Sequence, residues 1–193
     1  KEALYSQSIL DEVAKIDLES CRLGSFDELS VLKVSNFSYQ RIRNLLYRWL
    51  LESSSIRLSA KQAEEIINLI IQKKESLDHV ILISSKDNNN SHDLRMFRRV
   101  LYLLPREYCT VLNKYKEKEW NLQSDLLLPT GKIGFKETKG KGLSLVHKSK
   151  KITVKGREGG ERCKPFGRDK SQKLKKLLQE SDVSPWLRDR LPL

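Results

Sequence analysis

The sequence has no apolar run of about 18 residues, which argues against a membrane-spanning helix. Its 3 cysteines, Cys21, Cys109 and Cys163, are far apart and odd in number, so a disulfide framework is not indicated and a reducing setting fits better. The first residues also lack the apolar core of a secretory signal. We therefore expect a cytoplasmic protein without a leader or membrane anchor.

Motifs of catalysis and cofactor binding are missing as well. There is no Walker-type glycine loop, no dinucleotide-binding fingerprint and no G-x-S-x-G turn. His79, His92 and His147 are isolated, so we expect no metal site. Cys163 lies between two basic residues, which would favour its thiolate, but no general base accompanies it and an ordinary surface thiol is the simpler interpretation. The sequence predicts no catalytic residues and no cofactor in this chain.

Positive charge is abundant and unevenly distributed. The net charge is +12, and residues 129–193 alone hold 18 Lys/Arg against 7 Asp/Glu. A concentrated positive field attracts polyanions, of which phosphate backbones are the most common. A solvated basic surface or tail is the alternative, but this segment also shows strand and helix patterns that a tail would lack.

Helical periodicity dominates the first third. We expect an acidic helix from the start of the chain to about Gly24, with one apolar side formed by Leu4, Ile9, Leu10, Val13, Ile16 and Leu18. A second helix begins at about residue 39 and has an apolar face of Ile42, Leu45, Leu46, Trp49 and Leu50, with Arg41, Asn44 and Arg48 opposite. Ser59 and Gln62 predict a capping box that opens a third helix with Ala63, Ile66, Ile67, Ile70 and Ile71 on its apolar face. The last two helices would form a helical hairpin.

After residue 76 the pattern changes to strands. Residues 77–85 and 93–104 predict a β-hairpin that ends at Pro105. Further on, residues 121–135 predict two strands joined at Pro129–Gly131, residues 143–156 predict another pair, and a helix is expected at 170–180. The fold class is α+β: a helical hairpin with a small β-hairpin module, then a second small α+β module with antiparallel strands and one helix. We place the domains at 1–109 and 122–193, with a linker at 110–121.

The stretch "GREGGERCKPFGRDKSQKLKKLLQE", residues 156–180, combines glycines with basic residues. Glycine lets phosphate oxygens reach backbone N–H groups, arginine offers a two-donor fork, and a helix N-terminus adds partial positive charge. Gly159, Gly160 and Gly167 are therefore predicted to contact phosphate through their backbone. The alternative is a charged β-turn joined to a helix. Phe166 and Trp186 are interpreted first as core anchors, and otherwise as platforms that stack on an unpaired base.

Several motifs also carry a family resemblance. The order G-R-x-G-G-E-R, P-x-G-R, L-K-K-L-L-Q-E and P-W-x-R-x-R-L-P-L in residues 156–193 resembles the C-terminal module of bacterial tRNA(Ile)-lysidine synthases. Upstream, "YQRIRNLLYRWL" resembles the family's Q-R-N-x-L-R-x-W-L helix, although Ile42-Arg43 is an addition before Asn44 and Tyr47 takes a usually basic place. "RMFRRVLYLLP" resembles its arginine-rich strand pair, and "LLLPTGKIGF" resembles its L-P-x-G turn.

The resemblance implies an enzyme that uses ATP to adenylate C2 of the wobble cytidine in a tRNA(Ile) with a CAU anticodon, after which lysine displaces AMP. In that family the ATP and Mg site lies in a PP-loop domain opened by S-G-G-x-D-S, a motif absent here. This chain would then be the tRNA-holding portion, inactive alone, with residues 1–24 as the end of a linker helix from the catalytic domain. Lysine and ATP would be substrates of that other domain.

The residues expected to contact tRNA are all basic. They are Arg41, Arg48, Arg95, Arg98, Arg99, Arg157, Arg162, Lys164, Arg168, Lys173, Lys176, Arg188 and Arg190. Alternatives remain: a stand-alone RNA-binding module, a DNA-binding protein that uses the helical hairpin, or an oligomerisation module. The sequence does not decide whether the chain forms a homodimer.

Overall fold

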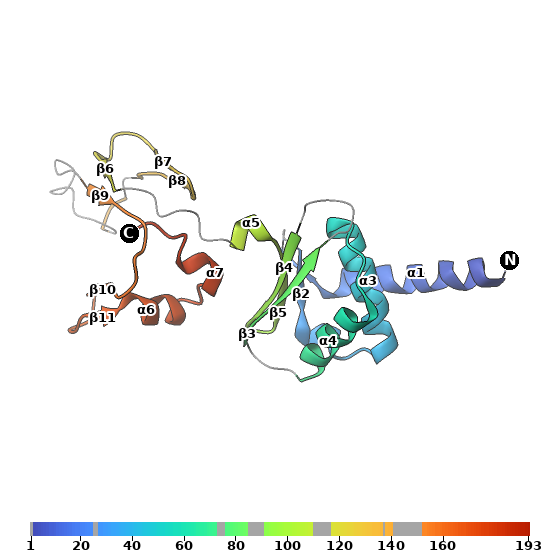
Figure 1. The fold of residues 1–193 in the computed structure, drawn as a ribbon. Coiled ribbons are helices and arrows are strands. Elements are labelled where there is room, and N and C mark those ends of the chain that lie inside the picture. Colours follow the sequence, from blue (N-terminus) through green and yellow to red (C-terminus); the bar gives the residue numbers. More distant parts are fainter. Residues whose placement is uncertain are drawn as a thin grey trace. The chain divides into compact units, whose positions relative to one another are not determined.

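The computed structural model describes residues 2–24, 27–72, 76–84, 91–109, 117–136, 138–140 and 152–193. Within strand 76–84, side chains are described only for Ile81 and Ile83. The chain divides into two compact units, residues 1–109 and 110–193 (Figure 1). Both mix helices with small antiparallel sheets, so the predicted α+β class is confirmed.

The helices of the first unit are α1 (Glu2–Cys21), α2 (Val31–Val34), α3 (Tyr39–Ser54), α4 (Ala60–Ile71) and α5 (Arg106–Cys109). The predicted capping box is confirmed: the backbone N–H of Gln62 donates to Ser59 Oγ at 3.2 Å, and the backbone N–H of Ser59 donates to Gln62 Oε1 at 3.1 Å. Each bond satisfies an N–H that has no partner within the helix. The local sequence thus determines where α4 begins.

The strands of the first unit are β1 (Arg22–Leu23), β2 (Glu28–Ser30), β3 (Ser76–Ser84), β4 (Ser91–Phe97) and β5 (Val100–Pro105). They form one antiparallel sheet in the order β1-β2-β5-β4-β3. The predicted single strand 93–104 is wrong, because the chain reverses at Arg98-Arg99 and pairs Phe97 with Val100. Both arginines have positive φ, 49° and 60°. A two-residue turn of this kind is usually recognised in a sequence by the pair Asn-Gly. The pair Arg-Arg therefore gives no sign of the turn.

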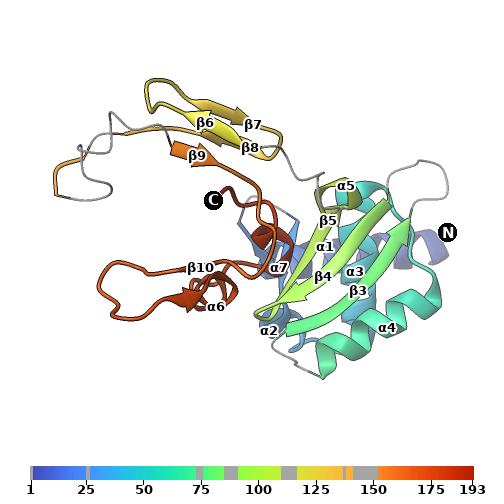
Figure 2. The same cartoon turned by 60° about the vertical axis from the view of Figure 1, so that its left-hand side comes forward.

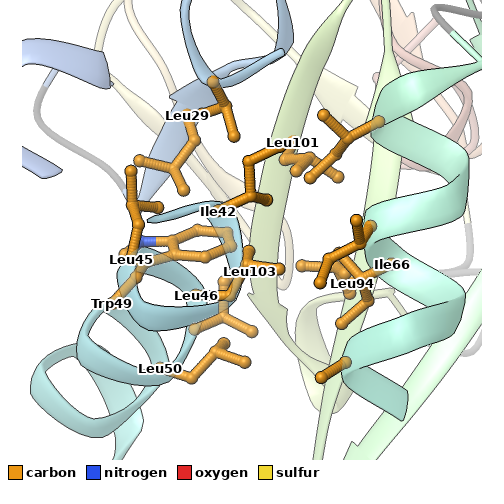
Figure 3. Close-up of a cluster of buried hydrophobic side chains, with 14 of the residues drawn as sticks. Leu29, Ile42, Leu45, Leu46, Trp49, Leu50, Ile66, Leu94, Leu101 and Leu103 are labelled. Carbon is orange, nitrogen blue, oxygen red and sulfur yellow. The ribbon is translucent and has the colours of Figure 1, made fainter. Parts of the chain in front are cut away.

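The core of this unit lies between the sheet and its helices. In both views α1, α3 and α4 lie on the same face of the sheet (Figures 1 and 2). Figure 3 shows Trp49 and Leu46 from α3, Ile66 from α4, and Leu94 and Leu101 from the sheet converging in one cluster. The predicted apolar faces of α3 and α4 are buried, except that Ile71 is 51% exposed. That exception follows from position, since Ile71 is the last residue of α4.

The apolar side predicted for the first helix is largely wrong. Leu4, Ile9, Leu10 and Ile16 are exposed, and the buried residues of α1 are Ala14, Asp17, Leu18 and Cys21. Those four have the i, i+3, i+4, i+7 spacing of a single helix face. Positions 16 and 18 are separated by about 200° around a helix, so Ile16 and Leu18 were never on one side.

The described residues of the second unit form three two-stranded ladders and two short helices. Strand β6 (Lys118–Trp120) pairs with β9 (Ile152–Val154), β7 (Leu126–Leu128) with β8 (Gly131–Ile133), and β10 (Arg162–Cys163) with β11 (Gln172–Lys173). Helices α6 (Leu174–Glu180) and α7 (Pro185–Arg188) follow. Its apolar cluster is small, with Trp120, Leu122, Leu128 and Val154 buried.

Two predictions for this unit need correction. The helix expected at 170–180 begins only at Leu174, because Gln172 and Lys173 belong to β11. The expected linker 110–121 contains β6, whose Trp120 belongs to the core. The strand pair expected at 143–156 stays a prediction, because 143–151 lie outside the described residues; Ile152–Val154 form β9 and pair with β6. The strand–turn–strand at Pro129–Gly131 is confirmed as β7 and β8.

Trp49→Ala should destabilise the first unit strongly. The Trp49 side chain is fully buried between α3 and the sheet, so its loss leaves a cavity costing about 3 kcal/mol or more. The free energy of unfolding measured by denaturant titration should fall by that amount. Leu51→Ala on the same helix is the matched control, since Leu51 is 49% exposed and should change stability little. Equal stability of Trp49→Ala and wild type would contradict the assigned core.

Candidate nucleic-acid interface

The glycine-rich turn at residues 156–161 already contains an anion of its own. The carboxylate of Glu161 accepts hydrogen bonds from the backbone N–H groups of Glu158 and Gly159, both at 2.5 Å. Gly159 and Gly160 have φ of 96° and 82°, a backbone conformation that favours glycine. The glycines are thus needed to wrap the backbone around a carboxylate. Phosphate contact at Gly159 stays a prediction, but its N–H is engaged.

Arg157 belongs to the same arrangement. Its guanidinium lies 3.3 Å from Glu161 and 2.9 Å from Asp189, and its side chain is only 11% exposed. Burial by itself would raise the pKa of Glu161, but the backbone N–H groups of Glu161, Gly159 and Glu158, together with Arg157, outweigh it and lower the pKa to about 2. The turn is therefore held by a carboxylate that is ionised at any physiological pH.

The β10–β11 hairpin carries the next predicted residues. Arg162 donates to the Ser171 carbonyl at 2.9 Å across the hairpin. Arg168 donates to Gln172 at 2.7 Å and to Glu180 of α6 at 2.8 Å. These bonds fix the ends of the loop to strand and helix. Lys164, in the same loop, is exposed.

The tip of this loop is a β-turn. The Arg168 N–H donates to the Pro165 carbonyl at 3.1 Å, and Gly167 has φ of 78°. This fits a type II turn, whose third residue needs positive φ and is usually glycine. Phe166 at the second position has a relative exposure of 107%. Its interpretation as a core anchor is therefore wrong.

The remaining predicted residues of the second unit differ in exposure. Lys173, just before α6, is exposed, and Lys176 is 66% exposed at 3.9 Å from Glu180. Arg188 is buried and donates to the Val183 carbonyl at 2.9 Å. Arg190 is half-buried, and so is Trp186. Lys173 and Lys176 thus present their charge to solvent, whereas Arg188 stabilises the segment just before α7 through its bond to Val183.

The predicted residues of the first unit lie on different elements. Arg41 on α3 makes an ion pair with the buried Asp17 of α1, with its Nε 2.9 Å from Asp17 Oδ2, and its guanidinium lies 4.3 Å from the Phe37 ring centroid. Arg48 pairs with Glu52. Arg95 lies 2.7 Å from the buried Asp93, while Arg98 and Arg99 form the β4–β5 turn. Arg95, Arg98 and Arg99 thus lie on one hairpin, whereas Arg41 and Arg48 lie on α3.

One basic residue of the loop was missed. Lys170 is exposed within the β10–β11 loop, beside Arg168. The signal that could have found it is the charge of the loop itself, because residues 162–173 hold five Lys/Arg against Asp169 alone. With Arg162, Lys164, Arg168 and Lys173, it makes a basic hairpin on a fixed backbone. We call residues 162–173 the basic hairpin.

Metal ligands and a reactive thiol are the remaining candidates for chemistry in the described part of the chain. No group of three or more His, Cys, Asp or Glu residues there could hold a metal ion. Burial raises the pKa of the Cys109 thiol to about 11, which suppresses its thiolate. None of the described helices is long and apolar enough to cross a membrane.

Glu161→Gln should destabilise the second unit at neutral pH. A carboxyl with a folded-state pKa of about 2, against an ordinary 4.5, contributes stability that is fully present above 4.5 and is lost as the pH falls towards 2. The difference in thermal midpoint between wild type and Glu161→Gln should therefore be large at pH 7 and shrink on acidification. Glu158→Gln, which removes the same charge from an exposed side chain of the same turn, is the control. A pH-independent difference would mean that the carboxylate does not hold the turn.

Comparison with known proteins gives a consistent result. Residues 152–193 match the family model described as TilS substrate C-terminal domain. A tRNA(Ile)-lysidine synthase of Coxiella burnetii is 32% identical over 187 residues, covering 96% of this chain and 39% of the relative. Those of Legionella pneumophila strain Lens and of Nitrosomonas europaea are 31% and 29% identical, covering 89% and 96% of this chain and 37% and 39% of the relatives. The chain thus spans about two fifths of the length of these curated relatives. It belongs to the tRNA(Ile)-lysidine synthase family.

Proposed function

We propose that this chain is the tRNA-binding portion of a tRNA(Ile)-lysidine synthase and that its basic hairpin holds the phosphate backbone of the tRNA. The observation that carries the proposal is an excess of exposed positive charge on a loop whose backbone is fixed at both ends. A fixed loop loses little conformational entropy on binding, so its charges can bind phosphate with a small entropic penalty. The names of the matched relatives support tRNA as the polyanion.

The chemical step is assigned to the part of the enzyme that this chain does not span. By resemblance, that step is the ATP-dependent attachment of lysine to C2 of the wobble cytidine in a tRNA(Ile) with a CAU anticodon. The turn at residues 158–161 is a poor place for ATP, because its N–H groups already bind Glu161. We therefore place no ATP or Mg site among the described residues, and we expect the 193-residue chain alone to transfer no lysine and release no AMP. Such an enzyme would act in the cytoplasm.

Arginines and lysines have different tasks in this proposal. Arg157, Arg162 and Arg168 each make hydrogen bonds within the chain and shape the surface. Lys164, Lys170 and Lys173 extend into solvent, where a long flexible ammonium can reach phosphate. A surface of this kind binds ground state and transition state alike, so in the complete enzyme it would lower the KM for tRNA and leave kcat nearly unchanged.

The DNA-binding alternative finds less support. The helical hairpin uses its apolar faces for the core, and the exposed side of α4 carries Glu64 beside Lys61. A carboxylate at the start of a recognition helix would repel phosphate.

Binding of tRNA should depend steeply on salt. With about four to six phosphate contacts, log K should fall by about 3 to 5 per tenfold increase in salt. Replacing Lys164 and Lys170 by Ala should reduce that slope by about 2, because two contacts are lost, without changing the melting temperature. The measurement is fluorescence anisotropy of labelled tRNA over a salt series.

The matched control is a double variant that loses the same charge elsewhere. Lys15→Ala with Lys61→Ala removes two exposed lysines from α1 and α4 and should leave the slope as in wild type. A salt-independent wild type, or equal effects of the two double variants, would show that the hairpin does not hold phosphate.

A further inference from the structure

Phe166 occupies a costly position for an apolar side chain. It is fully exposed at the tip of the β10–β11 loop, so the ring gains none of the stabilisation that burial gives an apolar side chain. In both views the loop between β10 and β11 extends away from α6 (Figures 1 and 2). Nothing in its own loop covers the ring.

The backbone conformation of the turn holds the Phe166 ring in its exposed position. Gly167 with φ of 78° and the Arg168–Pro165 hydrogen bond of 3.1 Å define the turn, and Arg168 ties it to Glu180 of α6 at 2.8 Å. The turn is therefore anchored to a helix rather than loosely tethered. An anchored turn presents its second residue in a defined direction.

The surroundings of the ring are basic. Lys164 and Lys170 are exposed and flank Phe166 in the sequence of the loop, and Arg168 is 41% exposed although paired, with Asp169 as the acid of the loop. An apolar, flat side chain between cations fits a partner with a negatively charged backbone and flat apolar faces. Single-stranded nucleic acid has both, because its bases offer π-faces next to phosphates, whereas paired bases within a duplex hide theirs.

We propose that Phe166 stacks on an unpaired base of the bound RNA while the lysines beside it hold the neighbouring phosphates. This inference rests on the proposed function and adds that the basic hairpin reads a single-stranded part of its substrate. The stacking contribution depends on contact area and is insensitive to salt, whereas the lysine contribution falls with salt. The two contributions can therefore be separated by experiment.

The test compares three substitutions at Phe166 in the 193-residue chain. Phe166→Ala should weaken tRNA binding about tenfold at constant salt and leave the salt slope unchanged. Phe166→Trp should bind within about twofold of wild type, since it keeps a π-face, whereas Phe166→Leu should be as weak as Phe166→Ala. All three should melt at the wild-type temperature, because the ring makes no core contact. Lys164→Ala is the reference variant, because the loss of a phosphate contact should reduce the salt slope of tRNA binding.

A second comparison tests the unpaired base. The effect of Phe166→Ala should be seen with tRNA and disappear with a long blunt RNA duplex, whose interior offers no exposed base face. An equal effect on both would overturn the inference, as would wild-type affinity of Phe166→Ala or a lowered melting temperature.

Binding by Phe166→Leu distinguishes stacking from a plain apolar contact. If Phe166→Leu binds tRNA as wild type does, the ring makes only an apolar contact and the stacking inference is wrong. Phe166-dependent binding to anionic phosphatidylglycerol vesicles that persists in Phe166→Leu would show a lipid surface as the partner and overturn it too. If the wild-type chain binds no tRNA at all, the proposed function fails and this inference with it. Unchanged binding by Phe166→Ala beside tight wild-type binding overturns this inference alone.

Discussion

The Glu161 carboxylate and its hydrogen bonds organise the basic segment of the second unit. Its side chain closes the turn at residues 158–161 and reaches Arg157, which in turn pairs with Asp189 after α7. Its backbone carbonyl accepts a hydrogen bond from Leu174 at 2.8 Å, at the start of α6. One residue therefore connects the turn, α6 and the segment after α7. Since the apolar cluster of this unit is small, polar contacts carry much of the order between residues 156 and 193.

Because this unit depends on polar contacts, its arginines and lysines have different roles. Holding many positive charges in one small unit costs repulsive energy, which nearby acids and carbonyl groups reduce. Arg157, Arg168 and Arg188 fulfil this role well, because the guanidinium group donates several hydrogen bonds in a fixed plane. Lys164, Lys170 and Lys173, each with a mobile point charge, remain at the surface. The basic character of the sequence thus overstates how much of the charge is available to a ligand.

Local sequence patterns predicted the first unit correctly where the apolar residues of a helix lie on one face. The apolar faces of α3 and α4 and the capping box at Ser59 were all found, because spacing and end residues determine them locally. The same method failed at α1, where apolar residues are distributed around the helix and only packing selects Leu18 over Ile16. It also failed at Arg98-Arg99, since positive φ in arginine leaves no mark in composition.

The sequence by itself determined the family, the α+β class, the helical hairpin and the concentration of positive charge in the last third. These properties follow from residue order and spacing alone. Only the tertiary structure decided that Glu161 occupies the glycine turn, that Arg157 and Arg188 are turned inward, and that Phe166 faces solvent. Arg157 is turned inward by Asp189, which lies 32 positions along the chain, and a local pattern cannot link the two. The partners of Glu161 and Arg188 lie within five residues, but a linear pattern does not contain the backbone conformation that brings them together. The exposure of Phe166 depends in the same way on the conformation of its turn.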